Sequence, residues 1–296
     1  MGEQKIWQAV ELLKTTISYF QEKGVDEARL SAELLLGHVL QRTRLELYLK
    51  HDEPVSGAEL ERFRALCRQR LAGRPVQYCT GEQYFYGLRF VVDERVLIPR
   101  PETELVVEHA MGLLGERGHD GDRRCRVLDI GTGSGCIAIT MAHLDAALDM
   151  VALDCSPGAL DVARLNVAGF GFGERVTVVE GDLFDAAFPE LVPGGRVDMI
   201  VSNPPYISRF EWEQLEPQVR CHEPALALCS EQGLECYEAV IRHAGKLLTT
   251  GGRLVFELHA DGAAPVGALM REAGFVGLVT EKDYGGFERI LSGRLS

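Results

Sequence analysis

From residue 125 onward, short apolar segments alternate with segments of helical periodicity, and this alternation restricts the possible folds more than any other feature of the chain. The apolar segments predict strands at residues 125–130, 149–153, 176–180, 197–202 and 253–258. Strands that are apolar along their whole length are typical of a parallel sheet with helices on both faces. Two segments near the end of the chain, 275–281 and 287–292, predict a hairpin. We therefore expect an α/β fold, with a doubly wound sheet and an antiparallel hairpin at its edge.

The first part of the chain has a different pattern, because its apolar residues recur at helical spacing. One such helix face is formed by Ile6, Val10, Leu13 and Ile17. Residues 76–98 are richer in aromatic and β-branched residues and predict a hairpin. We therefore divide the chain into a small helical bundle at residues 1–75, a hairpin and linker at 76–122, and the doubly wound domain at 123–296.

Composition indicates a cytoplasmic protein that does not bind nucleic acid directly. The chain has 296 residues and 46% hydrophobic content, which is enough for two domains. Its net charge is −13, and all of the excess acid follows residue 80, whereas phosphate binding requires Lys and Arg. No membrane span is expected, because no apolar run approaches about 18 residues. No signal peptide is expected either, because the start Met1-Gly2-Glu3-Gln4-Lys5 lacks an apolar h-region.

The eight cysteines contain no C-x-x-C pair, so we expect reduced thiols and no metal. The neighbours Cys221 and His222, followed by Cys229 and Cys236, do not have the spacing of a zinc site. A local basic cluster is formed by Arg62, Arg64, Arg68, Arg70 and Arg74, and we interpret it as a solvated helix face.

A glycine-rich turn follows the first predicted strand of the sheet. The turn and the acid before it comprise Asp129, Gly131, Thr132, Gly133, Ser134 and Gly135. Glycines let the backbone approach a ligand closely, and the helix that follows offers free N–H groups. The spacing G-x-G-x-G differs from the dinucleotide fingerprint G-x-G-x-x-G. A tight strand–helix connection without a ligand is the alternative interpretation.

Acidic residues follow the next two predicted strands. Asp154 is placed to accept hydrogen bonds from both ribose hydroxyls of a nucleoside, or alternatively to act as a helix N-terminal acid before Ser156. Asp182 is placed to accept from an adenine amino group, with Leu183 and Phe184 as apolar walls. Acids in these places argue against a phosphate ligand. They favour a nucleoside that carries positive charge, such as a sulfonium.

The segment Asn203-Pro204-Pro205-Tyr206 follows the fourth predicted strand, at the sheet edge where ligands gather. Neither proline has a backbone N–H, so the segment offers carbonyl acceptors and hardly any donors. The side-chain oxygen of Asn203 and the carbonyl of Pro204 can accept the two N–H bonds of one planar –NH2 group. Tyr206 supplies a face that stacks on that group. A proline-rich turn that merely ends a strand is the alternative.

Together these motifs resemble the class I S-adenosylmethionine-dependent methyltransferases that act on an exocyclic or amide nitrogen. The resemblance narrows to the PrmC/HemK family through four further stretches: Pro75 to Glu82, Phe85 to Val92, Leu97 to Glu104, and Asp283 to Arg289. It covers nearly the whole chain. Two positions depart from the family pattern. Glu257-Leu258-His259 replaces an acid, a residue and a glycine, and Leu183 stands where some members have an aromatic residue.

The resemblance implies a methyl transfer from S-adenosylmethionine, with S-adenosylhomocysteine as product, to the glutamine N5 of the Gly-Gly-Gln motif in class 1 peptide-chain release factors. It implies a Rossmann-like domain and an N-terminal helical domain that docks the release factor. The implied catalytic residues are Asn203, Pro204 and Tyr206, which also bind the substrate together with Pro205. The implied cofactor residues are Asp129, Gly131, Thr132, Gly133, Ser134, Gly135, Asp154, Asp182, Leu183 and Asn203.

Three other functions remain open at this point. A DNA or RNA adenine-N6 methyltransferase uses the same acceptor chemistry on a flipped base, but the acidic body of this chain disfavours a nucleic-acid channel. A binding module without activity has no need of the acceptor tetrapeptide. A nicotinamide oxidoreductase is disfavoured by the glycine spacing.

Overall fold

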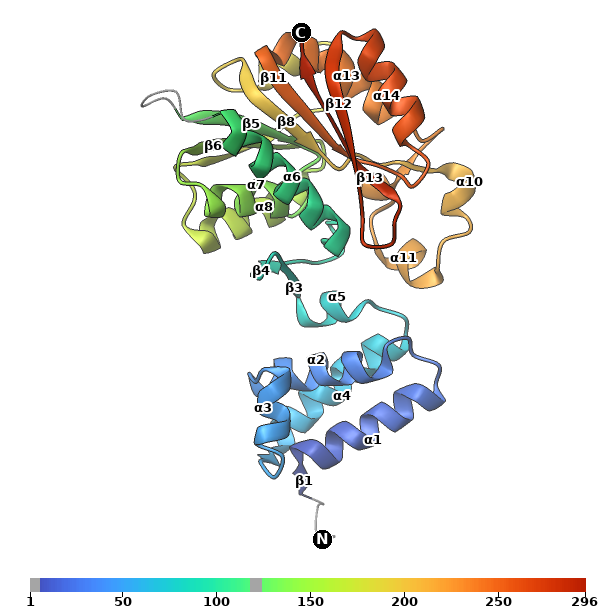
Figure 1. Cartoon of the computed structure of the whole chain (residues 1–296). Coiled ribbons are helices and arrows are strands. Elements are labelled where there is room, and N and C mark those ends of the chain that lie inside the picture. The colour runs from blue at the N-terminus through green and yellow to red at the C-terminus, as the bar shows by residue number, and fades with distance from the viewer. Residues whose placement is uncertain (1–5, 118–123) are drawn as a thin grey trace. The chain divides into compact units, whose positions relative to one another are not determined.

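The computed structural model describes residues 6–117 and 124–296 (Figure 1). The chain forms two compact units. One unit runs to Glu82 and also includes Glu216–His222, and the other comprises Gln83–Leu215 and Glu223–Ser296. The boundary that we predicted between residues 122 and 123 lies outside the described residues.

The first unit is helical and has its own apolar core. Its helices are α1 (Ala9–Glu22), α2 (Ala28–Leu40), α3 (Arg44–Leu49), α4 (Gly57–Leu71), α5 (Val76–Thr80) and α11 (Pro217–His222). The short strands β1 (Trp7–Gln8) and β2 (Pro54–Val55) pair antiparallel. Leu13, Phe20 and Phe63 are buried in one cluster. Thr43 and Ser56 begin α3 and α4 with capping boxes, which satisfy backbone N–H groups that a helix start leaves free.

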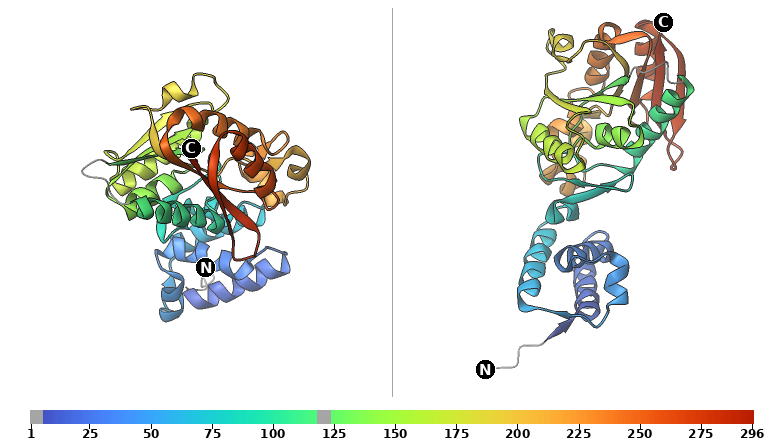
Figure 2. Two further views of the ribbon diagram at one scale, coloured as in Figure 1. Left: turned by 45° about the horizontal axis from the view of Figure 1, so that its top comes forward. Right: turned by 90° about the vertical axis from the view of Figure 1, so that its left-hand side faces the viewer.

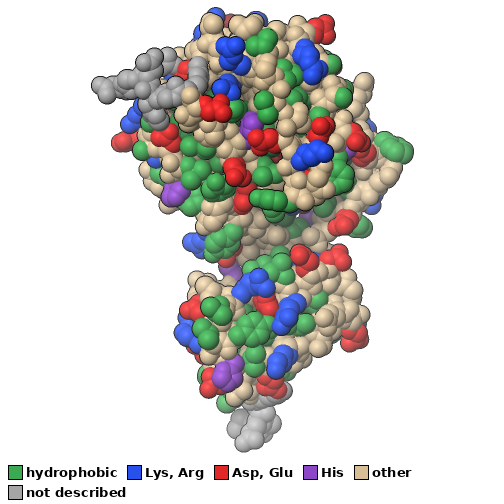
Figure 3. Space-filling model, in the orientation of Figure 1, with side chains coloured by type: hydrophobic (Ala, Val, Ile, Leu, Met, Phe, Trp, Pro, Cys, Tyr) green, Lys and Arg blue, Asp and Glu red, His purple; other side chains and the backbone are tan. Residues whose placement is uncertain are grey.

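Two details of this unit differ from the sequence prediction. Residues 76–80 form α5 rather than the start of the hairpin, because Val76 and Cys79 lie on one helical face that packs into the helical core. Arg70 does not belong to a solvated basic face, since it is buried and its guanidinium donates to Ser31 Oγ at 3.1 Å and to Gln218 Oε1 at 2.8 Å. On the face drawn in Figure 3, acidic and basic side chains are interspersed.

The second unit contains a seven-stranded sheet in the order β12-β13-β11-β8-β5-β6-β7 (Figures 1 and 2). Its strands are β5 (Cys125–Ile130), β6 (Leu148–Asp154), β7 (Val176–Glu180), β8 (Val197–Ser202), β11 (Leu248–Glu257), β12 (Phe275–Lys282) and β13 (Glu288–Leu295). Of these seven strands, β13 runs opposite to the other six, and it pairs antiparallel with both β11 and β12. The predicted doubly wound sheet with an edge hairpin is therefore confirmed. The chain order reverses between β5 and β8, which is where open sheets of this kind bind ligands.

Helices cover both faces of this sheet. They are α6 (Pro101–Arg117), α7 (Cys136–Leu144) and α8 (Pro157–Phe170) on one face, and α9 (Phe188–Leu191), α13 (Glu235–Leu247) and α14 (Ala263–Glu272) on the other. Leu128 and Ile130 of β5 share a buried cluster with Tyr237 and Val240 of α13. Because side chains alternate along a strand, Val127 and Asp129 point to the opposite face.

Shorter elements complete the second unit. They are β3 (Glu82–Phe85), β4 (Leu88–Val91), β9 (Ile207–Ser208), α10 (Arg209–Trp212), α12 (Ala225–Leu228) and β10 (Cys229–Ser230). The hairpin of β3 and β4 turns at Tyr86 and Gly87, which both have positive φ (51° and 75°), as a two-residue type I′ turn requires. Among the described residues, no helix is long and apolar enough to cross a membrane, and no cluster of His, Cys, Asp and Glu is arranged to hold a metal ion.

Neighbouring aromatic residues of α1 provide a test of the helical core. Phe20 is fully buried, whereas Tyr19 is 46% exposed. We expect Phe20→Ala to lower the free energy of unfolding of the helical unit by about 3–5 kcal/mol, because it leaves a cavity. The matched change Tyr19→Ala should cost about 1 kcal/mol or less. Urea denaturation followed by circular dichroism measures both, and equal losses would contradict the core described here.

Candidate active site

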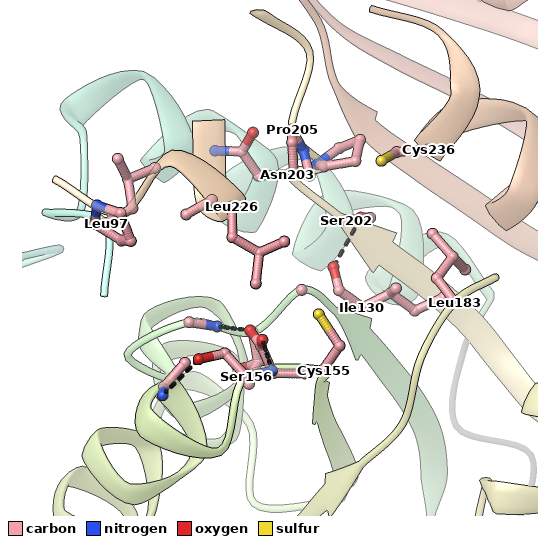
Figure 4. A pocket seen from close by; sticks show the side chains of 18 of the residues that line it. Leu97, Ile130, Cys155, Ser156, Leu183, Ser202, Asn203, Pro205, Leu226 and Cys236 are labelled. Atoms are coloured by element: carbon pink, nitrogen blue, oxygen red, sulfur yellow. Dashed lines mark hydrogen bonds between the residues drawn. The ribbon is translucent and has the colours of Figure 1, made fainter. Parts of the chain in front are cut away.

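A cavity of about 680 Å³ opens where the carboxyl ends of β5, β6 and β8 meet (Figure 4). The glycine-rich turn, the residues after β6 and β7, and the segment Asn203–Pro205 all line it, as does the stretch from Arg95 to Thr103. In Figure 4, Cys155 and Ser156 lie on one side of the cavity, and Asn203 and Pro205 on the other. The structure therefore brings together segments that are distant in sequence and that we predicted to act together.

The glycine-rich turn has the backbone that its sequence requires. Gly131, Gly133 and Gly135 all have positive φ (75°, 55° and 82°), a region that side chains disfavour. A Cβ on Gly135 would lie 3.1 Å from Ile139 Cδ1 and 3.7 Å from the backbone of Ala163. Gly135 therefore allows α7 and α8 to pack closely, while Gly131 to Ser134 form the cavity wall.

Asp129 lies beneath this turn, outside the cavity lining. It is fully buried, and its Oδ2 accepts a hydrogen bond from Thr132 Oγ1 at 2.6 Å. Its Oδ1 has no hydrogen-bond partner among the described residues. Burial raises the pKa of Asp129 to about 7, an effect that the Thr132 hydroxyl opposes. The carboxylate therefore holds the turn through Thr132, and its Oδ1 remains available as a hydrogen-bond acceptor.

Asp154 lines the cavity at the end of β6 and ties two neighbouring segments together. Its Oδ2 accepts from the backbone N–H of Gly133 at 2.9 Å, and its Oδ1 accepts from the N–H of Ser156 at 2.9 Å. Ser156, rather than Asp154, is the N-cap of α8. Burial raises the pKa of Asp154, while the backbone N–H groups oppose this shift. Each carboxylate oxygen can accept a further hydrogen bond from a ligand.

The residues after β7 form another part of the cavity wall. Asp182 Oδ1 accepts from the backbone N–H of Phe184 at 2.8 Å, which fixes the loop. Leu183 lines the cavity and packs against the sheet core, and its carbonyl oxygen lies 3.0 Å from His243 Nε2. Phe184 also lines the cavity but is 58% exposed. Leu183 and Phe184 therefore both line the cavity beside Asp182.

In the tetrapeptide after β8, the side-chain amide of Asn203 is held at its nitrogen end only. Asn203 Nδ2 donates to Thr103 Oγ1 at 3.1 Å, and its Oδ1 accepts no hydrogen bond from the described residues. Pro204 and Pro205 line the cavity beside Asn203. Tyr206 is not part of the lining; its hydroxyl donates to Glu257 Oε1 at 3.2 Å, and its ring lies 5.7 Å from that of His259.

Thr103 and Glu257, which no sequence motif marked as functional, meet behind the tetrapeptide. Thr103 Oγ1 donates to Glu257 Oε2 at 2.6 Å, and the hydroxyl of Tyr237 donates to the backbone oxygen of Glu257 at 2.9 Å. Burial raises the pKa of Glu257 to about 7, and Thr103, Arg289 and Tyr206 oppose that shift. The position of Glu257 directly at the end of the last parallel strand was the one signal available in the sequence.

A second buried carboxylate, Glu223, was also missed, and no sequence signal marks it. Its Oε2 accepts from the backbone N–H of Ile98 at 3.2 Å, and its Oε1 accepts from Arg100 Nη2 at 2.6 Å. These bonds fix the stretch Leu97–Arg100, of which Leu97, Pro99 and Arg100 line the cavity. The extended proline–arginine segment is therefore a wall of the site, anchored by residue 223.

Comparisons with known proteins agree with this arrangement. Residues 11–81 match a family model described as the PrmC N-terminal domain, and residues 121–282 match a methyltransferase domain. The chain is 54% identical over 292 residues to the release factor glutamine methyltransferase of Chlorobaculum tepidum, covering 99% of each chain. This protein belongs to the release factor glutamine methyltransferase family. The enzyme of that name from Geobacter sulfurreducens is 39% identical, with 98% of each chain covered.

Solved structures show the same fold at low sequence identity. The N-terminal domain of human METTL16 in complex with SAH has a TM-score of 0.55 and 17% identity, with 95% of this chain and 94% of that chain covered. A methyltransferase from Pyrococcus furiosus has a TM-score of 0.50 and 16% identity, with 81% and 98% covered. These likenesses support the class I methyltransferase fold. The family membership comes from the closer relatives.

The buried carboxylate of Glu257 makes a testable contribution to the pH dependence of stability. Its pKa is raised from 4.5 to about 7 in the folded chain, so folding favours the protonated form. The resulting stabilisation is fully present below about pH 4.5 and is lost as the pH rises through about 7, with an upper limit of about 3 kcal/mol. Glu257→Gln should therefore lose less stability than wild type between pH 5 and pH 8, about the limits of this window.

Urea denaturation at both pH values measures this difference. The exposed strand residue Glu288 provides the matched control, because Glu288→Gln should follow the wild-type pH dependence. If Glu257→Gln lost as much stability as wild type over this range, the raised pKa would be wrong.

Proposed function

We propose that this protein transfers a methyl group from S-adenosylmethionine to the side-chain amide nitrogen, N5, of the glutamine in the Gly-Gly-Gln motif of class 1 release factors. One observation carries the proposal. Asn203, whose Oδ1 is free to accept, and Pro204 line one cavity together with the glycine-rich turn, Asp154 and Asp182. The turn and the two carboxylates suit a cationic nucleoside. Two relatives that cover 99% and 98% of the chain are named release factor glutamine methyltransferase, which supports a glutamine of a release factor as the substrate.

The residues present fit the proposed methyl donor. Asp154 keeps acceptor capacity for ribose hydroxyls, and Asp182 stands beside the apolar walls formed by Leu183 and Phe184. Ser134 lines the cavity, and its buried hydroxyl has no hydrogen-bond partner among the described residues. Gly131, Thr132 and Gly133 would hold the ligand through the close approach of their backbone. When bound, S-adenosylmethionine supplies an electrophilic methyl group on a sulfonium.

Asn203 and Pro204 would orient the substrate nitrogen. An amide nitrogen is a poor nucleophile because its lone pair is delocalised into the carbonyl. Two acceptors, Asn203 Oδ1 and the Pro204 carbonyl, would bind the two N–H bonds and direct the lone pair toward the methyl group. Pro204 and Pro205 restrict the backbone, so these acceptors are already placed when the substrate enters. The protein's contribution is then orientation and stabilisation of developing positive charge.

Tyr206 lies next to Pro205 but outside the cavity lining, so it would stack on the substrate amide at the edge of the cavity while its hydroxyl remains anchored on Glu257. No strong general base is required, because the nitrogen becomes acidic as it is methylated. Burial and the neighbouring Glu257 carboxylate raise the pKa of Tyr206 above its usual range, so the phenol stays protonated. Tyr206 would therefore act as a donor and a stacking surface rather than as a base.

A protein substrate fits the charge of this chain better than a nucleic acid. The net charge of −13 is concentrated after residue 80, in the part that contains the cavity. A flipped adenine would bring phosphates to this acidic surface. We assign the helical residues 1–75 to release-factor docking, residues 76–122 to the hairpin and linker, and residues 123–296 to catalysis. We place the protein in the cytoplasm, where release factors act, without direct contact to nucleic acid or membrane.

The deciding experiment is incubation with a purified class 1 release factor and S-adenosylmethionine, followed by peptide mass spectrometry. We expect one added methyl group on the glutamine of the Gly-Gly-Gln motif. A parallel reaction receives adenine-containing oligonucleotides in place of the release factor. Methylation of the oligonucleotides but not of the release factor would reverse the proposal in favour of adenine.

Removal of the acceptor should separate catalysis from cofactor binding. Asn203→Ala removes one of the two acceptors that bind the substrate amide, so we expect no detectable methyl transfer. The affinity for S-adenosylmethionine should stay within about tenfold, or ~1.4 kcal/mol. Mass spectrometry measures the first quantity and calorimetry the second. Near-normal turnover by this variant would contradict the orienting role of Asn203.

A substitution at Asp154 should lower the affinity for S-adenosylmethionine. Asp154→Asn replaces a carboxylate by a group with one acceptor oxygen, so the affinity for S-adenosylmethionine should fall by about 10- to 100-fold. Asp149 on the same strand, whose partly exposed side chain pairs with Arg124 at 2.9 Å, provides the matched control Asp149→Asn. Calorimetry compares the two variants. Equal affinities would show that Asp154 does not hold the ligand.

A further inference from the structure

A chain of hydrogen bonds leads from the side-chain amide of Asn203 to the buried carboxylate of Glu257. Asn203 Nδ2 donates to Thr103 Oγ1 at 3.1 Å, and Thr103 Oγ1 donates to Glu257 Oε2 at 2.6 Å. The three groups come from the end of β8, the first turn of α6 and the end of β11. Thr103 and Glu257 are 3% and 2% exposed, so water does not compete for these bonds.

The protons available in this series of hydrogen bonds determine which group donates at each step. An ionised carboxylate only accepts, so the single hydroxyl proton of Thr103 must point to Glu257. The Thr103 oxygen then has only lone pairs left for Asn203. Asn203 must therefore turn its –NH2 end toward Thr103, which leaves Oδ1 as the free end of the amide. With the amide reversed, Oδ1 would face another acceptor, which is unfavourable in a buried site.

We propose that Thr103 and Glu257 are positioning residues that set the direction of the Asn203 amide, so that its oxygen rather than its nitrogen receives the substrate. This inference rests on the proposed function, because it concerns the acceptor that binds the glutamine amide. Neither residue needs to touch the substrate for this purpose. Their effect passes through Asn203.

The same carboxylate also holds the other polar side chain of the tetrapeptide. Glu257 Oε1 accepts from the hydroxyl of Tyr206 at 3.2 Å, while Oε2 accepts from Thr103. The two oxygens of one carboxylate therefore fix Asn203, through Thr103, and Tyr206 directly. The backbone oxygen of Glu257 accepts from Tyr237, which holds the end of β11 in place.

Protonation of Glu257 removes this constraint on the Asn203 amide. A carboxylic acid can donate to Thr103, and the Thr103 hydroxyl can then donate to Asn203 Oδ1. The groups around Glu257 are Glu102 and Thr103 of α6, Arg289 of β13, Tyr206 after β8, Tyr237 of α13 and Cys136 of α7. Arg289 favours the ionised form and Glu102 opposes it. Burial raises the pKa of Glu257 to about 7, so the ordered chain forms above about that pH.

Substitutions at Thr103 test the chain without changing the volume of the site. Thr103→Val keeps the shape but removes the hydroxyl, and we expect kcat for release-factor methylation to fall by about 10- to 100-fold. Thr103→Ser keeps the hydroxyl and should retain most of the activity. Thr140, buried in α7 with no hydrogen-bond partner for its hydroxyl among the described residues, provides the control Thr140→Val, which should leave kcat unchanged.

A binding measurement gives a readout that does not depend on turnover. In the presence of S-adenosylhomocysteine, a Gly-Gly-Gln peptide should bind more weakly to Thr103→Val than to Thr103→Ser. The affinity for S-adenosylhomocysteine itself should be the same in both variants. Calorimetry measures both quantities. A loss of both affinities in Thr103→Val would indicate collapse of the cavity and overturn the positioning role.

The pH profile tests the charge of Glu257. Wild-type kcat should rise between about pH 6 and about pH 8 as Glu257 ionises. Glu257→Gln should lack this rise and should have a lower kcat at the upper end, because its amide does not fix the direction of the chain. Asp129, whose pKa also lies at about 7, is present in both proteins. The difference between the two profiles therefore reports on Glu257.

The outcomes separate this inference from the proposed function. If wild type methylates the release factor and Asn203→Ala does not, but Thr103→Val equals Thr103→Ser, the positioning role is wrong and the proposed function stands. Parallel pH profiles of wild type and Glu257→Gln lead to the same conclusion. If wild type does not methylate the release factor at all, the proposed function fails, and the inference fails with it.

Discussion

The parallel arrangement of β5, β6 and β8 is the constraint on which the site depends. Ile130 at the end of β5 pairs in register with Leu153 of β6 and with Ser202 of β8. Because parallel strands end at the same edge, whatever follows each strand is delivered to one place. The glycine turn, Asp154 and Asn203 thus meet at one cavity, although they are separated by helices along the chain. The strands themselves carry mostly apolar, buried side chains, so the polar residues of the site are those that follow the strands.

Three carboxylates occupy this edge: Asp129 and Glu257 are buried and Asp154 is half-buried, and each illustrates how a protein retains charge away from water. Burial raises the pKa of Asp129, Asp154 and Glu257. Hydrogen bonds offset part of that cost in each case: from Thr132 to Asp129, from backbone N–H groups to Asp154, and from two hydroxyls to Glu257. A cationic ligand would stabilise the ionised forms further. A sulfonium nucleoside therefore suits the electrostatics of this cavity better than a phosphate would.

The sequence predicts the fold and the cavity wall because both depend on local patterns. Apolar runs bounded by glycine, acid or proline mark five of the seven strands within one residue at each end, whereas β11 begins five residues earlier than predicted and β13 ends three residues later. Residues that follow β5, β6, β7 and β8 line the cavity. Contacts that depend on distant partners were not predictable: Thr103 and Glu257 lie 154 positions apart, and no period or motif joins them. Residues 76–80 were misassigned because a β-rich composition does not show that Val76 and Cys79 share a helical face. The anchoring of Tyr206 on Glu257 was missed for the same long-range reason.

The direction of the Asn203 amide shows what packing alone cannot specify. The –NH2 and oxygen ends of an amide have nearly the same shape, so rotation about the terminal bond changes no volume and no apolar contact. Pro204 and Pro205 fix the backbone but leave this rotation free. Only hydrogen bonds of known direction distinguish the two states, and such a chain needs a group that accepts and never donates. An ionised Glu257, buried where its partners are Thr103 and Tyr206, is that group. Burying the Glu257 carboxylate costs free energy, but only a group that cannot donate can fix which end of the Asn203 amide faces the cavity.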